Sequence, residues 1–107
     1  MVNVRVAIEQ GDLTKFEEVL APDIVWVGIW PGQLCRTRDE VLEMLRAAQA
    51  NGLEARPEIV RDEGDRFVVD PHLDGRHQVF VLHDDVVSEV RAYPTRDAAL
   101  AAMDPPW

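Results

Sequence analysis

Hydrophobic residues recur with two different periods along this chain, and the change of period separates predicted helices from predicted strands. Helical spacing opens the sequence: a short helix is predicted over residues 2–10, and Gly11 ends it. Asp12 is a favourable N-cap for a second helix, which Pro22 stops. Each helix gathers its apolar side chains on one side: Val4, Ala7 and Ile8 in the first, and Leu13, Phe16, Val19 and Leu20 in the second.

A strand and a capped helix come next. Residues 24–30 are rich in β-branched and aromatic side chains, which favours a strand, and a Pro-Gly pair then breaks it into a loop. Thr37 and Glu40 form a capping-box pattern: the Thr37 hydroxyl accepts a hydrogen bond from the backbone N–H of Glu40, whose side chain reaches back. The helix that follows ends near Gly52 and has one apolar face: Val41, Leu42, Leu45 and Ala48.

The second half of the chain changes to the two-residue period of strands, interrupted by short polar turns. Strands are predicted over residues 57–62, 66–73, 76–82 and 86–93. The turns between them are Glu63-Gly64-Asp65, Asp74-Gly75 and His83-Asp84-Asp85. Thr95 is a suitable cap for a last, alanine-rich helix, and residues 103–107 form a tail. This order of elements predicts an α+β meander with helices on one face of a curved sheet.

The turn between the strands predicted over residues 66–73 and 76–82 sets how these two strands pair. A two-residue Asp74-Gly75 turn pairs Leu73 with Arg76. Because side chains alternate between the two faces, every second pair lies on the same face, so Val69 is predicted to face Phe80.

The second hairpin has two possible turns. A two-residue loop would place Glu89 and Arg91 beside Phe80 in an apolar layer, and burying unpaired charge is costly. A three-residue loop, residues 83–85, avoids this and asks Asp85 to adopt a left-handed conformation. It predicts a concave face, covered by helices, that carries Phe67, Val69, Pro71, Leu73, Gln78, Phe80, Leu82, Ser88, Val90 and Ala92. The convex face then carries Val68, Asp70, His72, His77, Val79, Val81, His83, Val87, Glu89, Arg91 and Tyr93.

Composition excludes several classes of partner. The 107 residues suffice for one domain, residues 1–107, with one core. The formal net charge of −9, with acidic side chains along the whole length, argues against nucleic acid and anionic membranes as partners. The single cysteine, Cys35, excludes an internal disulfide and fits a reducing compartment. No apolar run reaches the length of a membrane span, so a soluble cytoplasmic protein is expected.

The histidines and the cysteine do not form a recognisable reactive site. His72, His77 and His83 with Asp70 match no standard zinc spacing, and the predicted register places them on the convex face among valines. We therefore expect solvent or interface residues there and no metal site. Cys35 is predicted to lie in a loop with no positioned base, and no glycine-rich phosphate loop is present.

Trp26 and Trp30 are the more informative pair. With Gly28 they lie on one face of the predicted strand over residues 24–30. They either fill the core, as tryptophans do in small domains, or line a pocket in which they stack on a flat or apolar ligand. The sequence leaves both interpretations open.

Residues 77–100, which read HQVFVLHDDVVSEVRAYPTRDAAL, form a closing hairpin that resembles the nuclear transport factor 2-like family. This superfamily includes SnoaL-like polyketide cyclases and ketosteroid isomerases. The resemblance covers nearly the whole chain and implies a cystatin-like, cone-shaped α+β fold. In that fold a curved, mostly antiparallel sheet carries helices packed on its concave face.

The same resemblance implies that the catalytic groups of the isomerases are missing. Their general-base carboxylate falls on Gly28, the tyrosine of their oxyanion hole on Val4, and their proton-donating aspartic acid on Gln78. The amide of Gln78 can still donate a hydrogen bond to a carbonyl oxygen, but no group is left to abstract a proton. The polar residue that often precedes the tyrosine of the closing strand in this family is Ala92 here.

These observations predict a pocket domain that binds a small apolar or carbonyl-bearing molecule, with no cofactor and no assigned catalytic residue. Trp26, Trp30 and Phe80 are the expected walls, and Gln78 and Ser88 the orienting polar groups. The alternatives are a SnoaL-like cyclase, isomerase or hydratase acting on an apolar substrate, and a structural dimer whose pocket is filled by its own tryptophans. A homodimer through the convex sheet face is expected, because valines alternate there with a polar rim.

Overall fold

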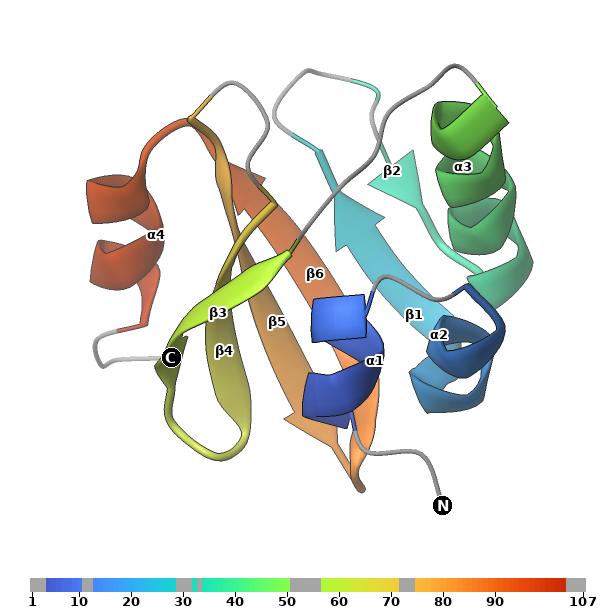
Figure 1. Ribbon diagram of the computed structural model, residues 1–107, viewed down its shortest axis with the longest axis horizontal. Helices are drawn as coiled ribbons and strands as arrows, with labels where there is room; N and C mark the ends of the chain where they lie inside the picture. Colours follow the sequence, from blue (N-terminus) through green and yellow to red (C-terminus); the bar gives the residue numbers. More distant parts are fainter. Residues whose placement is uncertain are drawn as a thin grey trace.

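The computed structural model describes residues 4–10, 13–28, 32, 34–50, 57–71 and 75–103. These residues form an α+β fold built on one curved sheet (Figure 1). The helices are α1 (Val4–Gln10), α2 (Leu13–Val19), α3 (Arg38–Ala50) and α4 (Arg96–Ala102). The strands are β1 (Leu20–Val27), β2 (Leu34–Cys35), β3 (Glu58–Asp62), β4 (Arg66–Asp70), β5 (His77–His83) and β6 (Val86–Tyr93).

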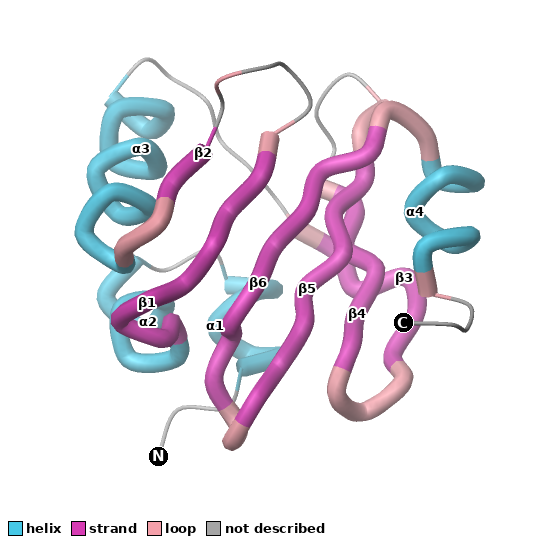
Figure 2. The backbone as a smooth tube through the Cα atoms, turned by 180° about the vertical axis from the view of Figure 1, so that it is seen from behind, coloured by secondary structure: helices cyan, strands magenta, loops and turns pink. Residues whose placement is uncertain are grey.

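The strands lie side by side in the order β2-β1-β6-β5-β4-β3. β1 runs parallel to β6, and the other neighbouring strands are antiparallel. Figure 2 shows the sheet from behind, with β1, β6 and β5 as its long central strands. The predicted α+β class and mostly antiparallel curved sheet are therefore confirmed. Cys35, expected in a loop, belongs instead to the short edge strand β2.

The concave face is covered by α1, α2 and α3, and the main core lies between them and the sheet (Figure 1). Ala7 and Ile8 of α1 and Val41 of α3 are completely buried there. They pack against the inward-facing side chains of the central strands, among them Phe67, Val69, Phe80 and Val90. The apolar faces predicted for the three helices are the faces that the fold buries.

The convex face is partly covered as well, which corrects the expectation that all helices pack on the concave side. α4 folds back over β4, β5 and β6 and buries a second cluster with Val68 and Val79, which are 0% and 1% exposed. Ala99 and Met103 are the residues of the α4 segment that close this cluster. Two of the valines expected at a dimer interface are therefore buried within the chain.

The hairpin of β4 and β5 pairs Phe67 with Phe80 and Val69 with Gln78. The predicted register is therefore wrong by two residues, although the faces are right because two residues is the period of a strand. β4 ends at Asp70, directly before Pro71, which has no N–H to donate to the ladder. The connection is thus longer than the predicted Asp74-Gly75 turn, whose first residue lies outside the described residues together with His72 and Leu73.

The hairpin of β5 and β6 combines a two-residue turn with a bulge, an arrangement that the sequence analysis did not consider. Asp84 and Asp85 both have positive φ, 53° and 64°, as a tight left-handed turn requires. Near the turn Leu82 pairs with Val87, but further along Val81 pairs with Glu89, so Ser88 is the extra residue.

The bulge explains why the three-residue loop was wrong while most of the predicted faces were right. The bulge absorbs one residue. Val90, which pairs with Phe80, and Ala92, which pairs with Gln78, therefore still lie on the predicted concave face. Val87, which lies between the turn and the bulge, moves from the predicted convex face into the concave core and is 0% exposed. Glu89 and Arg91 stay out of the apolar layer, as the cost of buried charge demands.

The first long strand begins earlier than predicted, directly after α2. Pro22 lies inside β1, exposed to solvent, in a stretch where the pairing with β6 shifts between Leu20 and Val25. An irregular stretch tolerates a residue that cannot donate a ladder bond. β1 ends at Val27, so Gly28 follows the strand, and Trp30 lies outside the described residues.

Two predicted helix starts are confirmed. The backbone N–H of Glu40 donates to the Thr37 hydroxyl at 3.2 Å, and the Glu40 carboxylate accepts from the backbone N–H of Arg36 at 3.2 Å. At α4 the backbone N–H of Ala98 donates to the Thr95 hydroxyl at 3.1 Å. The Asp12 cap, the predicted helix ends at Gly11 and Gly52, and residues 104–107 of the tail lie outside the described residues.

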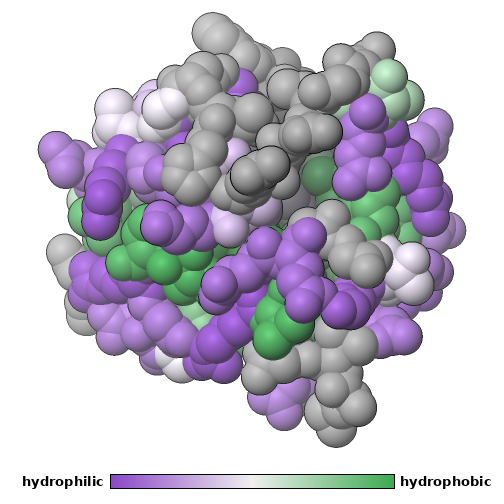
Figure 3. All heavy atoms as spheres, in the orientation of Figure 1, coloured by the Kyte–Doolittle hydropathy of each residue, from purple (hydrophilic) through white to green (hydrophobic). Residues whose placement is uncertain are grey.

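The surface carries both hydrophilic and hydrophobic side chains. Hydrophilic residues dominate the face seen in Figure 3, and hydrophobic side chains appear among them in separate patches. The large hydrophobic residues that stay exposed in the described part of the chain are Val6, Leu34 and Met44. None of the described helices is long and apolar enough to span a membrane.

Candidate functional site: a cavity beneath α3

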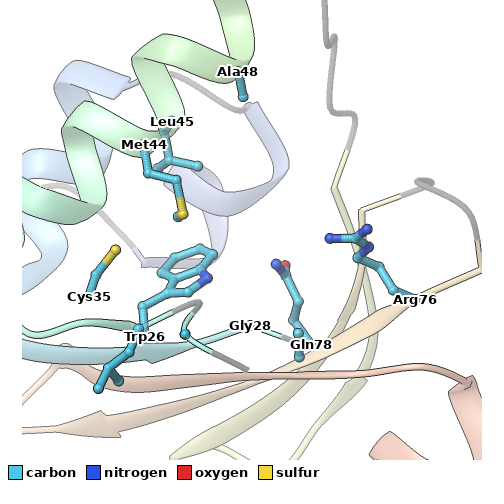
Figure 4. A pocket seen from close by; sticks show the side chains of 11 residues that line it. Trp26, Gly28, Cys35, Met44, Leu45, Ala48, Arg76 and Gln78 are labelled. Atoms are coloured by element: carbon cyan, nitrogen blue, oxygen red, sulfur yellow. The ribbon is translucent and has the colours of Figure 1, made fainter. Parts of the chain in front are cut away.

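A cavity of about 470 Å³ lies between α3 and the concave face of the sheet. Its floor is formed by Trp26 and Gly28 at the end of β1, Ala92 of β6 and Gln78 of β5. Met44, Leu45 and Ala48 of α3 form the roof. Figure 4 shows the thioether of Met44 and the side chain of Leu45 facing Trp26 across the space.

The cavity exists because side-chain size changes between two neighbouring rows of the sheet. In one row Trp26 pairs with Val90 and Val90 with Phe80, and large side chains fill the space below α3. In the next row Ala92 pairs with Gln78, and Gly28, one step beyond the last pair of β1, comes beside Ala92. Glycine and alanine leave room that no side chain of the described residues fills.

Trp26 belongs both to the core and to the cavity wall. Its ring meets that of Phe80 edge to face, with centroids 5.9 Å apart and planes at 74°, and only 7% of the residue is exposed. One edge of the indole still faces the cavity, and Figure 4 shows its ring nitrogen directed toward Gln78. The two interpretations of this tryptophan that the sequence left open therefore both hold, and for Trp30 neither is tested.

The polar groups of the wall come from one strand and the residues just before it. Gln78 of β5, expected to orient a ligand, does line the cavity, and Arg76, two residues earlier, lines it too. Figure 4 shows the Gln78 amide and the Arg76 guanidinium directed into the same space. Sequence analysis missed Arg76, although a residue two positions from Gln78 in an extended segment lies on the same face.

Cys35 lines the cavity from the edge strand, opposite Gln78 (Figure 4). Its partly buried thiol has a raised pKa, first because burial disfavours the thiolate and second because the nearby Glu40 carboxylate repels it. A thiol with a raised pKa is a poor nucleophile at neutral pH. Cys35 therefore acts as an apolar wall group.

Two other expected pocket residues lie elsewhere. Phe80 is 2% exposed and supports the floor from within the core, in contact with Trp26. Ser88, the bulged residue, donates from its hydroxyl to the backbone carbonyl of Val81 at 3.2 Å. Neither belongs to the described residues that line the cavity.

His77 and His83 lie away from the cavity, and His72 lies outside the described residues. His77 is buried on the convex face, not exposed as expected, and its Nδ1 lies 3.1 Å from the carbonyl oxygen of Gly75. Its Nε2 lies 3.7 Å from a carboxylate oxygen of Asp70, whereas His83 is exposed beside the turn. Within the described part of the chain, histidine, cysteine and carboxylate side chains form no group of three that could hold a metal ion.

Three carboxylates that could take part in acid–base chemistry, Asp62, Glu58 and Asp39, also lie away from the cavity. Asp62 binds Arg5 of α1 through two hydrogen bonds, 2.5 and 3.1 Å long, and accepts a third from the backbone N–H of Gly64. These bonds, that from Arg5 first, lower the pKa of Asp62. Glu58 and Asp39 are exposed and, like Asp62, are not among the described residues that line the cavity.

Solved structures of small α+β proteins share this fold. A SnoaL-like protein of unknown function from Burkholderia thailandensis is 15% identical, with a TM-score of 0.66, over 85% of this chain and 87% of that chain. An LEH-like epoxide hydrolase of M. tuberculosis is 17% identical, with a TM-score of 0.58, over 85% and 76%. A protein with a ketosteroid isomerase-like fold from Catenulispora acidiphila, in complex with trimethylamine, is 15% identical, with a TM-score of 0.59, over 97% and 91%.

At these identities the structures establish the fold and nothing of the chemistry. No curated protein matches the chain. The family model for the SnoaL-like domain matches residues 3–104. Because that match spans nearly the whole sequence, and the nuclear transport factor 2-like fold predicted from the closing hairpin is confirmed, this chain belongs to the SnoaL-like domain family.

Proposed function

We propose that this protein binds a small apolar molecule bearing a carbonyl or similar oxygen, in the cavity beneath α3. The observation that carries the proposal is an apolar cavity into which an amide and an indole nitrogen are directed (Figure 4). Its volume of about 470 Å³ falls within the range of small-molecule sites. Met44 and Leu45 offer hydrophobic contact, while Gln78 offers a hydrogen-bond donor that fixes the orientation of a carbonyl group.

The chemical groups of the described residues that line the cavity favour binding over catalysis. Proton transfer needs a carboxylate, an imidazole or a comparable group within reach of the reacting atom. Among the described residues that line the cavity none carries a carboxylate or an imidazole, and the pKa of the Cys35 thiol is raised. A cyclase, isomerase or hydratase remains the alternative for this fold. The structural-dimer alternative required a cavity filled by the protein's own tryptophans. Trp26 lies in the cavity wall, and Trp30 lies outside the described residues.

Thermal unfolding with a set of matched ligands tests the proposal. We expect 2-acetylnaphthalene and 2-methylnaphthalene to raise the Tm and to change tryptophan fluorescence. A ligand that binds only the folded state stabilises it by about 2.7 kcal/mol at a hundredfold excess over Kd. In a small domain this is a shift of several degrees. Ala92→Leu, which fills the hollow row, should abolish the shift. A wild-type protein that responds to neither compound would overturn the proposal.

The role of Gln78 can be separated from the apolar contacts. Gln78→Leu should weaken binding of 2-acetylnaphthalene by about 0.5–1.5 kcal/mol, the worth of one hydrogen bond, and leave 2-methylnaphthalene unaffected. Equal weakening of both compounds would show that the amide does not orient the ligand.

We further propose a homodimer located in the cytoplasm. The part of the convex face that remains for a partner copy lies over β1 and β6, where half-buried Val25 and Val27 adjoin the ion pair of Arg91 with Glu89, 3.1 Å long. Sedimentation at micromolar concentration should give a dimer, and Val27→Glu should give monomer. A wild-type species of about one chain mass, 12.1 kDa, would overturn the dimer. The reducing cytoplasm is supported by the single free cysteine.

A further inference from the structure

The hydrogen-bond donors of the cavity gather at its β5 end. Figure 4 shows the guanidinium of Arg76 and the amide of Gln78 both reaching into the space, with the indole nitrogen of Trp26 facing Gln78. The roof residues Met44 and Leu45, together with Leu34 of β2, form an apolar lining. The cavity thus has one polar end and one apolar end.

The backbone fixes this arrangement. Gln78 is held in the middle of the sheet by its pairing with Ala92 on one side and Val69 on the other. Arg76 comes two residues earlier, so its side chain leaves the chain on the same face at a spacing of about 6.6 Å. Ala92 is too small to separate either group from the cavity. A single ligand group that enters between them can contact both.

The guanidinium of Arg76 places a positive charge at this end. Arg76 is half-buried, and it is the one charged residue among the described residues that line the cavity. A guanidinium stays protonated and carries five N–H donors, so it can bind an oxyanion alongside other contacts of the same side chain. Hydrogen bonds between charged partners are roughly twice as strong as neutral ones.

The net charge of the chain makes the contact with Arg76 more important for an anionic ligand. The formal net charge of the chain is −9, so its long-range field repels anions rather than attracting them. An anionic ligand must therefore be held by contacts inside the cavity. A cationic ligand would gain from the outer field but would meet Arg76 within the wall.

We infer that the cavity selects an apolar molecule that carries one oxyanion, a carboxylate or an enolate, whose oxygens bind Arg76 and Gln78 while its apolar body lies against Met44 and Leu45. This inference rests on the proposed function, because it names the class of ligand for the same cavity. It adds Arg76 as the residue that distinguishes an acid from a neutral carbonyl compound.

Isothermal titration calorimetry with a matched ligand pair tests the inference. Naphthalene-2-carboxylate and 2-acetylnaphthalene share their ring system and differ in charge. We expect the wild-type protein to bind the carboxylate about tenfold more tightly, the difference expected when a charged hydrogen bond replaces a neutral one.

Two variants with the same change in net charge identify the residue. Arg76→Gln should lower the affinity for the carboxylate about tenfold and leave the ketone within twofold. Arg91→Gln, on the other face of the sheet, should change neither, and Arg76→Lys should retain part of the preference. The Tm of each variant without ligand shows that it is folded.

The outcomes separate the two proposals. Binding of the ketone without preference for the carboxylate would overturn the inference and leave the proposed function standing. A preference that survives Arg76→Gln would overturn it as well, because another group would then bind the oxyanion. A preference that Arg91→Gln removes equally would also overturn it, because the net charge of the protein, and not contact with Arg76, would then set the affinity. Failure of both compounds to bind would overturn the proposed function and the inference with it.

Discussion

Two neighbouring rows of the same sheet behave in opposite ways. The row that contains Trp26, Val90 and Phe80 is filled with large side chains and forms the core, and the next row, with Gly28, Ala92 and Gln78, borders the cavity. Both rows run across β1, β6 and β5, the second at the point where β1 has just ended. The cavity is therefore not a separate structural device. It follows from the size of a few side chains one step along β1, β5 and β6.

The largest expected difference between the rows lies on β5. Phe80→Ala should lower the free energy of unfolding by about 3–5 kcal/mol, because it opens a hole in the filled row and removes the ring contact with Trp26. Gln78→Ala, two residues away in the hollow row, should cost less than about 1 kcal/mol. Urea denaturation of both variants measures the difference. Similar losses would show that the cavity end is packed as tightly as the core.

The helix α3 offers the second pair of substitutions, one at the filled row and one at the cavity. Leu42 is 2% exposed, and Leu42→Ala should cost about 2–5 kcal/mol. Leu45, one turn further along α3, already borders empty space, so Leu45→Ala should cost less and change ligand binding instead. The same denaturation measurement, with titration of 2-methylnaphthalene, separates the two effects. A larger stability loss at Leu45 would contradict the division into a filled and a hollow end.

Substitutions that add volume should show the same asymmetry between the two rows. Val90→Phe overfills a row that has no space and should cost about 1–3 kcal/mol. Ala92→Leu adds volume two residues further along β6, where the cavity provides room, and should cost less than Val90→Phe. If Ala92→Leu proved the more destabilising of the two, the space above Ala92 would not be open in solution.

The smallest expected effect concerns the ion pair that joins α1 to β3 beside the filled row. Arg5 lies over the Phe67 ring, 4.9 Å from its centroid, and binds Asp62. The pKa of Asp62 is lowered, so its contribution is present above the unfolded value, about 3.9, and is lost as pH falls through the folded value. The side chains are 42% and 36% exposed, so the contribution is below about 1 kcal/mol.

Chemical denaturation at neutral and at acidic pH measures this contribution. The difference in stability between wild type and Asp62→Asn should shrink as the solution becomes acidic. Asp23→Asn, which replaces an exposed carboxylate on β1, serves as the control. A difference that grows on acidification would show that the sign of the pKa shift is wrong.

The parts of the fold that were predictable are those with local chemical signals. Thr37 and Thr95 cap their helices as expected, and Gly64, with φ of +89°, occupies the turn that its sequence predicted. The strand over residues 86–93 was predicted with its observed ends, Val86 and Tyr93. Such signals depend on neighbouring residues alone, so a single sequence contains them.

The bulge at Ser88 and the position of α4 were not predictable in this way. A bulge is a property of two paired strands, and nothing in the residues around Ser88 marks it. The rule against buried charge still gave the right faces for Glu89 and Arg91, because that rule acts on the final packing and not on the turn. The covering of Val68 and Val79 by α4 likewise depends on a chain reversal after Tyr93.

The candidate site was partly predictable for the same reason. Alternation along the strands placed Gln78 on the concave face and Trp26 on the same strand face as Gly28, and all three line the cavity. Arg76 follows from the same alternation and was overlooked. Met44 and Leu45 depend on where α3 lies over the sheet, which the pattern of one helix does not determine.

The bulge also separates the hairpin tip from the rest of the molecule. Turn and cavity lie on the same two strands, but the extra residue at Ser88 lets the pairing near Asp84 differ from the pairing at Ala92. Rearrangement of the tip, by substitution of the two aspartates or by insertion of a short peptide, can therefore be absorbed at the bulge before it reaches Gln78. For protein engineering, the tip is the place to attach a reporter or a fusion partner while the binding end keeps its shape.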